Sequence, residues 1–192
     1  MKIRLLLVFV TGMLALPLLA QTQTGNPCER ACLENYVDRY LQAMLEQDLN
    51  PALFARDIKF TENGIRLPLG NEGLWFGMSG LGGYKFYVPD IETQQVAFIG
   101  TLREGGSNPD DGTLVGFALR LKIAADRIVE IEQLVIRPET SLFGDGNNSS
   151  PFPPTGEGVE AMGAPHPVYT AVIPPAERAS REELIKTANY YF

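Results

Sequence analysis

Residues 36–60, YVDRYLQAMLEQDLNPALFARDIKF, predict an amphipathic helix followed by a turn and the start of a strand. Apolar side chains recur at the three- and four-residue spacing of one buried helical stripe, namely Val37, Tyr40, Leu41 and Met44. Asn50 and Pro51 are typical of the cap and first position of a second, short helical turn. Apolar and polar residues then alternate from Ile58, as they do in a strand.

The first twenty residues have the composition of a signal peptide. Lys2 and Arg4 form a short basic region, residues 5–19 are almost wholly apolar, and a small residue, Ala20, ends the run. Thr11, Gly12 and Pro17 interrupt the run, so a membrane span is not expected. The mature chain is therefore predicted to be exported, periplasmic or secreted, with no membrane association after cleavage.

The charge of the chain argues against a nucleic-acid partner. The net charge is −7 at neutral pH, and it becomes −9 when Lys2 and Arg4 leave with the signal peptide. An acidic surface repels phosphate backbones, and the sequence contains no basic stripe. We expect no nucleic-acid binding.

The remaining segments divide the chain into one domain and an appended arm. Residues 21–27 are predicted to be a mobile leader, and residues 28–138 to form the domain, with three long strands in its second half, at 96–103, 113–123 and 127–137. Asn63-Gly64, between apolar runs, is a signal for a two-residue hairpin. The Gly-rich segment 70–89 is expected either to wall a pocket, through Trp75 and Tyr84, or to be an ordinary loop packed on the core.

The C-terminal part is expected to be less regular. Residues 139–177 are rich in Gly and Pro and are predicted to be a linker or arm, with an edge strand or extended run at 168–173. Residues 178–192 are predicted to be a helix that begins with a capping box of Ser180 and Glu183. This helix either packs on the domain or begins a truncated second repeat.

The first helix and its following strand resemble the start of the NTF2-like superfamily, which includes SnoaL-like cyclases and ketosteroid isomerases. The resemblance rests on Arg39-Tyr40-Leu41, on Asp48-Leu49, on residues 53–57 and on the strand at 60–63, and it extends more loosely to about Pro138. It implies an α+β fold, in which a cone-shaped, curved antiparallel sheet wraps a long N-terminal helix. One such scaffold supports many chemistries, so the resemblance implies a fold and not an activity.

The resemblance to the isomerases also implies roles for individual positions. Tyr40 matches their oxyanion-binding tyrosine, although its place on the apolar stripe also suits a core tyrosine. Their general base corresponds to Asn63, which cannot take a proton, so Glu62 would replace it only if the strand turned Glu62 inward. Their second oxyanion donor corresponds to Phe117. Two of the three catalytic positions have therefore changed.

Further polar residues are candidates for a pocket. The resemblance places Gln133 inside the cone, and Arg137 either there or at its rim. With Asn63, Trp75 and Tyr84 they form the predicted substrate-binding set. His166 could act as an acid or base, or could simply be a surface residue of the arm.

The cysteine and histidine content limits metal chemistry. Cys28 and Cys32 are four residues apart, and export makes a disulfide plausible if Cys28 lies on the turn that starts the helix. With one histidine in the chain, no metal site is expected, and no cofactor motif is present.

Three functions remain open on the sequence. The first is an exported, cofactor-free lyase, dehydratase or isomerase that uses Tyr40, Glu62 and His166 for proton transfer. The second is a binding module for a small apolar or aromatic molecule. The third is an interaction domain that pairs with a second repeat or forms a homodimer through the sheet.

Overall fold

The computed structural model describes residues 27–138 and 155–190, so the predicted signal peptide lies outside the described residues. The domain contains α1 (Arg30–Glu46), β1 (Phe54–Glu62), β2 (Ile65–Arg66), α2 (Leu74–Gly77), β3 (Met78–Asp90), β4 (Gln95–Glu104), β5 (Thr113–Ala124) and β6 (Arg127–Ile136). The arm contains α3 (Thr155–Ala161), α4 (Pro167–Thr170), the 3-10 turn η1 (Pro175–Glu177) and α5 (Arg181–Asn189). Among the described residues, no helix is both long enough and apolar enough to cross a membrane.

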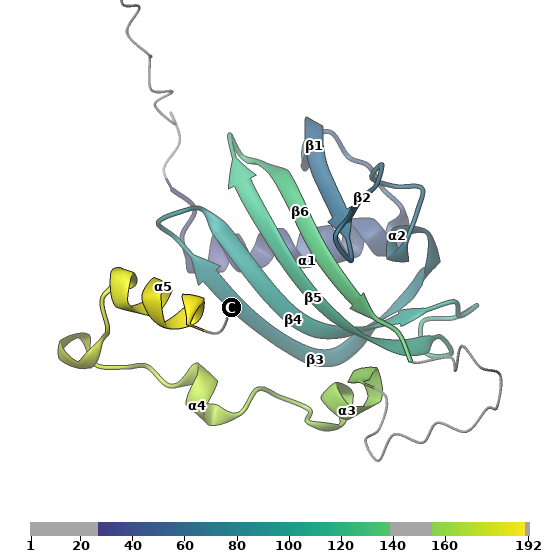
Figure 1. Ribbon diagram of the computed structural model, residues 1–192. Helices are drawn as coiled ribbons and strands as arrows, with labels where there is room; N and C mark the ends of the chain where they lie inside the picture. Colours follow the sequence, from purple (N-terminus) through teal and green to yellow (C-terminus); the bar gives the residue numbers. More distant parts are fainter. Residues whose placement is uncertain (1–26, 139–154, 191–192) are drawn as a thin grey trace, which may run out of the picture.

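Helix α1 lies in the hollow of a curved six-stranded sheet (Figure 1). The sheet order is β2-β1-β6-β5-β4-β3; β1 and β6 are parallel, and the other neighbours are antiparallel. The predicted stripe of α1 is buried against this sheet, with Val37, Tyr40 and Met44 fully inaccessible. The expected α+β architecture, a curved sheet wrapped on the first helix, is therefore confirmed.

The break after α1 is shorter than predicted. Gln47 ends the helix in the left-handed conformation, and its N–H bonds back to the last turn. The predicted short helical turn after Asn50 is present as a single turn: the Asn50 side chain accepts from the Ala52 N–H, and its carbonyl accepts from the Leu53 and Phe54 N–H groups. The strand that follows begins earlier than predicted, at Phe54. Phe54 and Phe60 are both buried, so packing on α1 holds this segment extended.

Residues 78–89 of the Gly-rich segment form most of the sheet's long edge strand, β3, instead of a loop, and residues 74–77 form the short helix α2. Within β3, glycine is required where neighbours approach closely: a side chain at Gly80 would meet the Pro109 backbone, and one at Gly82 would meet Thr101. The register of β3 against β4 also shifts between Leu81 and Lys85. These irregularities remove the two-residue alternation that would have identified a strand.

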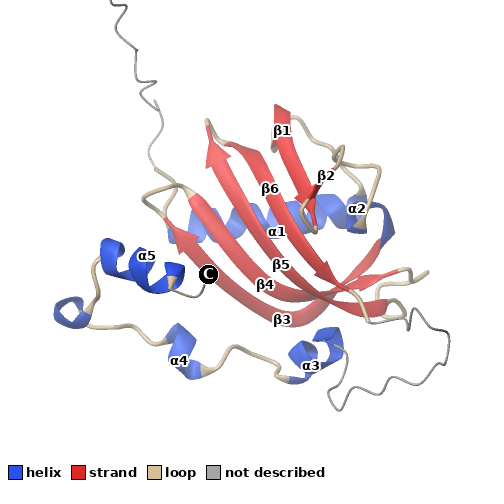
Figure 2. Ribbon diagram, viewed as in Figure 1, coloured by secondary structure: helices blue, strands red, loops and turns tan. Residues whose placement is uncertain are grey.

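The arm follows the β3 edge of the sheet (Figure 2). Helix α3 contacts β5, β4 and β3, and the Glu160 carboxylate accepts hydrogen bonds from the Gly83 and Tyr84 N–H groups and from the Thr101 hydroxyl. Helix α5 begins with the predicted capping box of Ser180 and Glu183. The strand considered for residues 168–173 is wrong, because residues 167–170 form the helical turn α4.

Candidate functional site

Tyr40 lies inside the cone, and its hydroxyl begins a chain of buried hydrogen bonds. The Tyr40 hydroxyl donates to the Gln133 Oε1 at 2.7 Å, and neither side chain is more than 2% exposed. Burial, together with the nearby negative charge of Glu62, raises the pKa of Tyr40 well above its ordinary value. Tyr40 is therefore a neutral hydrogen-bond donor at any physiological pH.

Glu62 is the centre of this chain, because the register of β1 turns it inward. Glu62 pairs with Gln133 across the parallel β1–β6 ladder, and the Gln133 Nε2 donates to its Oε2 at 2.8 Å. The Leu74 N–H, at the start of α2, donates to the same oxygen at 2.8 Å. Glu62 is only 6% exposed, so its charge is held by these donors and by one cation.

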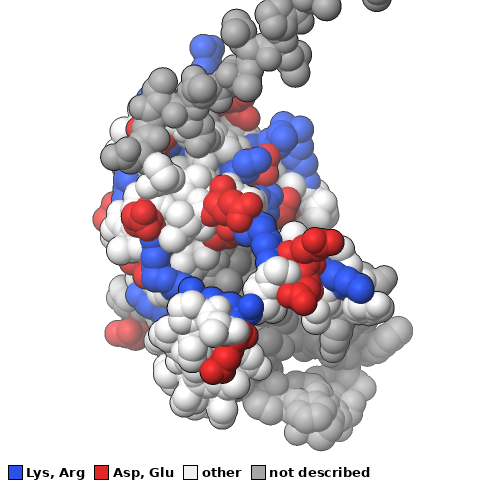
Figure 3. All heavy atoms as spheres, turned by 90° about the vertical axis from the view of Figure 1, so that its left-hand side faces the viewer, with Lys and Arg blue, Asp and Glu red and all other residues white. Residues whose placement is uncertain are grey.

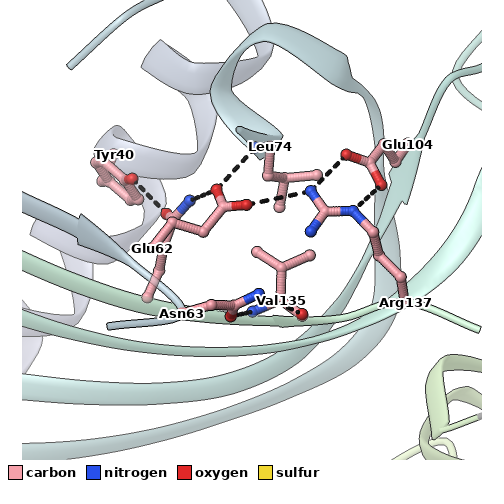
Figure 4. Close-up of polar contacts among 8 residues, drawn as sticks. Tyr40, Glu62, Asn63, Leu74, Glu104, Val135 and Arg137 are labelled. Carbon is pink, nitrogen blue, oxygen red and sulfur yellow. Dashed lines mark hydrogen bonds and ion pairs between the residues drawn. The ribbon is translucent and has the colours of Figure 1, made fainter. Parts of the chain in front are cut away.

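That cation is Arg137, which joins the buried chain to the protein surface (Figure 4). Its guanidinium donates to the Glu62 Oε1 at 3.1 Å and, through Nε and Nη2, to both carboxylate oxygens of Glu104, at 2.7 and 2.8 Å. The hydrogen bonds to Glu104, opposed by partial burial, raise the pKa of Arg137. Arg137 is 39% exposed, so it occupies the rim and not the interior.

Asn63 plays a backbone role. It adopts the left-handed conformation of the predicted turn with Gly64, which connects β1 to β2. Its amide exchanges two hydrogen bonds with the Val135 backbone, donating to the carbonyl at 3.2 Å and accepting from the N–H at 2.8 Å. The Asn63 side chain thus extends the pairing of β1 with β6, and its polar atoms bond to Val135 rather than to Tyr40.

Aromatic rings fill the cone around Tyr40. Its ring lies 5.7 Å from that of Trp75 and 6.3 Å from that of Phe54, measured between centroids. Trp75 is fully buried, and its indole N–H has no hydrogen-bond partner among the described residues. Trp75 therefore belongs to the packed core rather than to an open pocket wall.

The other two candidates are not part of this cluster. Tyr84 lies on β3 and is buried, and its backbone N–H binds Glu160. His166 is exposed in the arm, where its Nδ1 accepts from the Val168 N–H and caps α4. The structure thus brings together Tyr40, Glu62, Gln133 and Arg137, and it places His166 in a different part of the molecule.

A groove of about 840 Å³ lies between the β3 edge, the first turns of α1 and the arm. Its walls are Arg30 and Glu34 from α1, residues 85–88 from β3, and Pro165, residues 169–173 and Arg178 from the arm. This volume is within the usual range for small-molecule sites. Sequence reasoning missed the groove, because its three walls are far apart along the chain.

The groove combines aromatic and basic side chains. The Phe86 and Tyr169 rings contact each other with their centroids 6.0 Å apart, and the Tyr87 hydroxyl donates to Asp38 at 2.7 Å. Burial and that hydrogen bond raise the pKa of Tyr87, so its hydroxyl stays neutral. On the face drawn in Figure 3, basic and acidic side chains are interspersed, which differs from the basic stripe of a nucleic-acid-binding surface.

A disulfide joins Cys28 and Cys32 at the start of α1. Cys28 lies just before the helix, and Gln94 holds it by accepting from its N–H at 2.7 Å and donating to its carbonyl at 3.1 Å. This fixes the end of α1 that carries Arg30 and Glu34. Within residues 27–138 and 155–190, no group of three or more potential ligands is arranged to hold a metal ion.

Comparisons with known proteins assign no family to the chain. No family model and no curated protein matches the chain. Among solved structures, it is similar to a protein of unknown function with a cystatin-like fold from Methylobium petroleophilum PM1, with 19% identity, a TM-score of 0.44, and 80% of this chain and 100% of that chain covered. It is also similar to AclR from Streptomyces galilaeus, provisionally described as a hydroxylase, with 13% identity, a TM-score of 0.41, and 56% of this chain and 80% of that chain covered. Similarity at this level assigns no activity.

Proposed function

We propose that this protein is an exported small-molecule-binding domain, and that a small apolar or aromatic molecule binds in the groove between β3, α1 and the arm. The observation that carries the proposal is the groove itself, with its volume of about 840 Å³ and the paired rings of Phe86 and Tyr169 in its lining. Aromatic walls with a few polar groups are the usual composition of such sites. The disulfide at the start of α1 supports an oxidising, extracytoplasmic location.

The test is calorimetric titration with two probes that share one ring system, 2-naphthoate and 2-naphthamide. At least one of them should bind, and Tyr169→Ala should weaken that binding, because Tyr169 supplies one aromatic wall. Tyr190→Ala is the matched control, since Tyr190 is an exposed tyrosine of the arm that does not line the groove. Absence of binding by both probes, or equal weakening by both variants, would contradict the proposal.

A second candidate is cofactor-free proton transfer by a lyase, dehydratase or isomerase at Tyr40 and Glu62. It is favoured by the burial of both groups in an apolar cone, where a hydrogen bond to a developing anion is strong. It ranks second because the Tyr40 hydroxyl already donates to Gln133 and the Glu62 carboxylate already accepts from three donors. A substrate would have to displace one of these partners.

Proton transfer can be tested by NMR. Wild-type protein and Tyr40→Phe would be incubated with small cyclic ketones in heavy water, and exchange of the α-protons followed. The binding-module proposal expects no exchange above the buffer rate. Exchange that is present in wild type and lost in Tyr40→Phe would place the second candidate first.

Self-association through the sheet is a third proposal, supported by the outer face. Ile99, Ala118 and Leu134 are directly opposite one another on β4, β5 and β6, and Ile99 and Leu134 are about half exposed. A homodimer would bury this row. Sedimentation of wild type against Leu134→Lys would test it, and a wild-type protein that stays monomeric at high concentration would refute it.

A further inference from the structure

We infer that the groove selects a ligand in which a carboxylate or similar anion is attached to a flat apolar body. This rests on the proposed function, because it names the ligand class for the same groove. Three cations line the groove, Arg30, Lys85 and Arg178, against a single carboxylate, that of Glu34. The whole chain carries a net charge of −7, whereas the side chains that line the groove carry a net positive charge.

Two of the three cations are available to a ligand. Arg30 is engaged by Glu34, with Nη1 and Oε1 2.9 Å apart. The Lys85 ammonium has no hydrogen bond or ion pair with any residue in the described part of the chain. Arg178 donates through Nε to the Ile173 carbonyl at 2.9 Å, which orients its planar guanidinium and leaves its other N–H groups unused in that bond. An anion would be a suitable partner for both groups.

The apolar half of the ligand follows from the groove's rings. The Phe86 and Tyr169 rings contact each other at an interplanar angle of 46°, and one belongs to β3 while the other belongs to the arm. A flat ring that contacts both would therefore bridge the domain and the arm. Arg178 also belongs to the arm and Lys85 to β3, so the anion would bridge the same two parts. Both halves of the ligand would thus hold the arm against β3.

The β3 edge adds hydrogen-bonding capacity. β3 is the last strand of the sheet and has a strand neighbour on one side only, so its other edge carries backbone groups without a strand partner. Away from the groove, the Gly83 and Tyr84 N–H groups bind the Glu160 carboxylate at the register shift between β3 and β4, where that carboxylate also accepts from the Thr101 hydroxyl of β4. Beyond them, residues 85–88 line the groove.

The test compares 2-naphthoate with 2-naphthamide, which differ in charge but little in size. We expect the anion to bind the full chain about tenfold more tightly at low salt, as a hydrogen-bonded charge pair contributes roughly that much. In the double variant Lys85→Met/Arg178→Met, the two probes should bind with affinities within about twofold of each other, because the ring contacts remain. Lys122→Met, on a lysine that does not line the groove, should keep the full preference.

The outcomes separate the two proposals. Equal affinity for both probes in wild type would overturn the anion preference and leave the small-molecule proposal standing. If neither probe bound the wild-type protein, both the anion preference and the small-molecule proposal would be overturned. An anion preference that survives in Lys85→Met/Arg178→Met would place the anion elsewhere and refute the inference. Circular dichroism and the melting temperature of each variant establish that it is folded.

Discussion

Replacing Glu62 by glutamine keeps the shape of the most connected buried side chain and removes its charge. Three donors meet at this carboxylate: the Leu74 N–H and Gln133 Nε2 on one oxygen, and Arg137 on the other. An amide presents an oxygen on one side only, so Glu62→Gln cannot satisfy all three. The less costly orientation keeps the oxygen toward Leu74 and Gln133 and turns the NH₂ group toward Arg137.

The cost can be worked from these contacts. Losing the Arg137 bond removes one charge-assisted hydrogen bond, which contributes about 1.5–3 kcal/mol. The bonds from Leu74 and Gln133 remain but become neutral, and such bonds are roughly half as strong. Arg137 keeps Glu104 and partial exposure, which limits the penalty for its own charge. We expect Glu62→Gln to lower the free energy of unfolding by about 2–4 kcal/mol, a large part of a typical domain's stability.

Urea unfolding measures this directly. Trp75 is the only tryptophan of the chain and is fully buried, so its fluorescence reports the loss of the core. Glu132→Gln is the matched control, because Glu132 also binds an arginine, Arg120, at 2.8 Å but is 59% exposed. An exposed pair contributes about 0–1 kcal/mol. If Glu62→Gln destabilised the protein no more than Glu132→Gln, the central role assigned to Glu62 would be refuted.

Three further predictions concern the arm, a glycine and the disulfide. Burial acts to raise the pKa of Glu160, but hydrogen bonds from Thr101, Gly83 and Tyr84 outweigh burial, and the pKa is lowered. The ionised carboxylate that holds the arm is therefore fully present above the ordinary carboxyl pKa. Attachment of the arm weakens as the pH falls through the lowered pKa. Limited proteolysis should therefore cut the arm faster at acid pH in wild type, and Glu160→Gln should be cut fast at every pH; a pH-independent wild type would count against this attachment. Gly73→Ala should cost about 1–3 kcal/mol more than Gly64→Ala in urea unfolding, because both have positive φ but only a side chain at residue 73 would meet the Glu62 carboxylate; equal costs would disprove the close contact. Reducing the Cys28–Cys32 disulfide should lower the free energy of unfolding by about 2 kcal/mol, the chain-entropy contribution of so short a loop. Calorimetry with and without reductant measures this difference. No difference would mean that the loop is already ordered in the unfolded chain.

Much of the fold follows from local patterns in the sequence. The apolar stripe of α1, the Asn63-Gly64 turn and the Ser180–Glu183 capping box each depend on residues within a few positions of one another, and each is present in the structure. The exceptions are instructive. Local sequence does not predict β3 as a strand. Its glycines are required by close contacts with Pro109 and Thr101, which are distant in the sequence.

The site required the tertiary structure. Sequence alone placed Tyr40 and Gln133 inside the cone, but the direction of Glu62 depended on the register of β1 against β6, and a shift of one residue would have turned it outward. Glu62 and Gln133 are 71 residues apart in the chain, and the groove likewise joins Arg30, Lys85 and Arg178 from three distant segments. Local propensities act over a few residues, whereas these contacts depend on the whole path of the chain. The sequence therefore determined the helix, the turns and the inward face of the sheet, and only the packed fold decided which charged groups would meet.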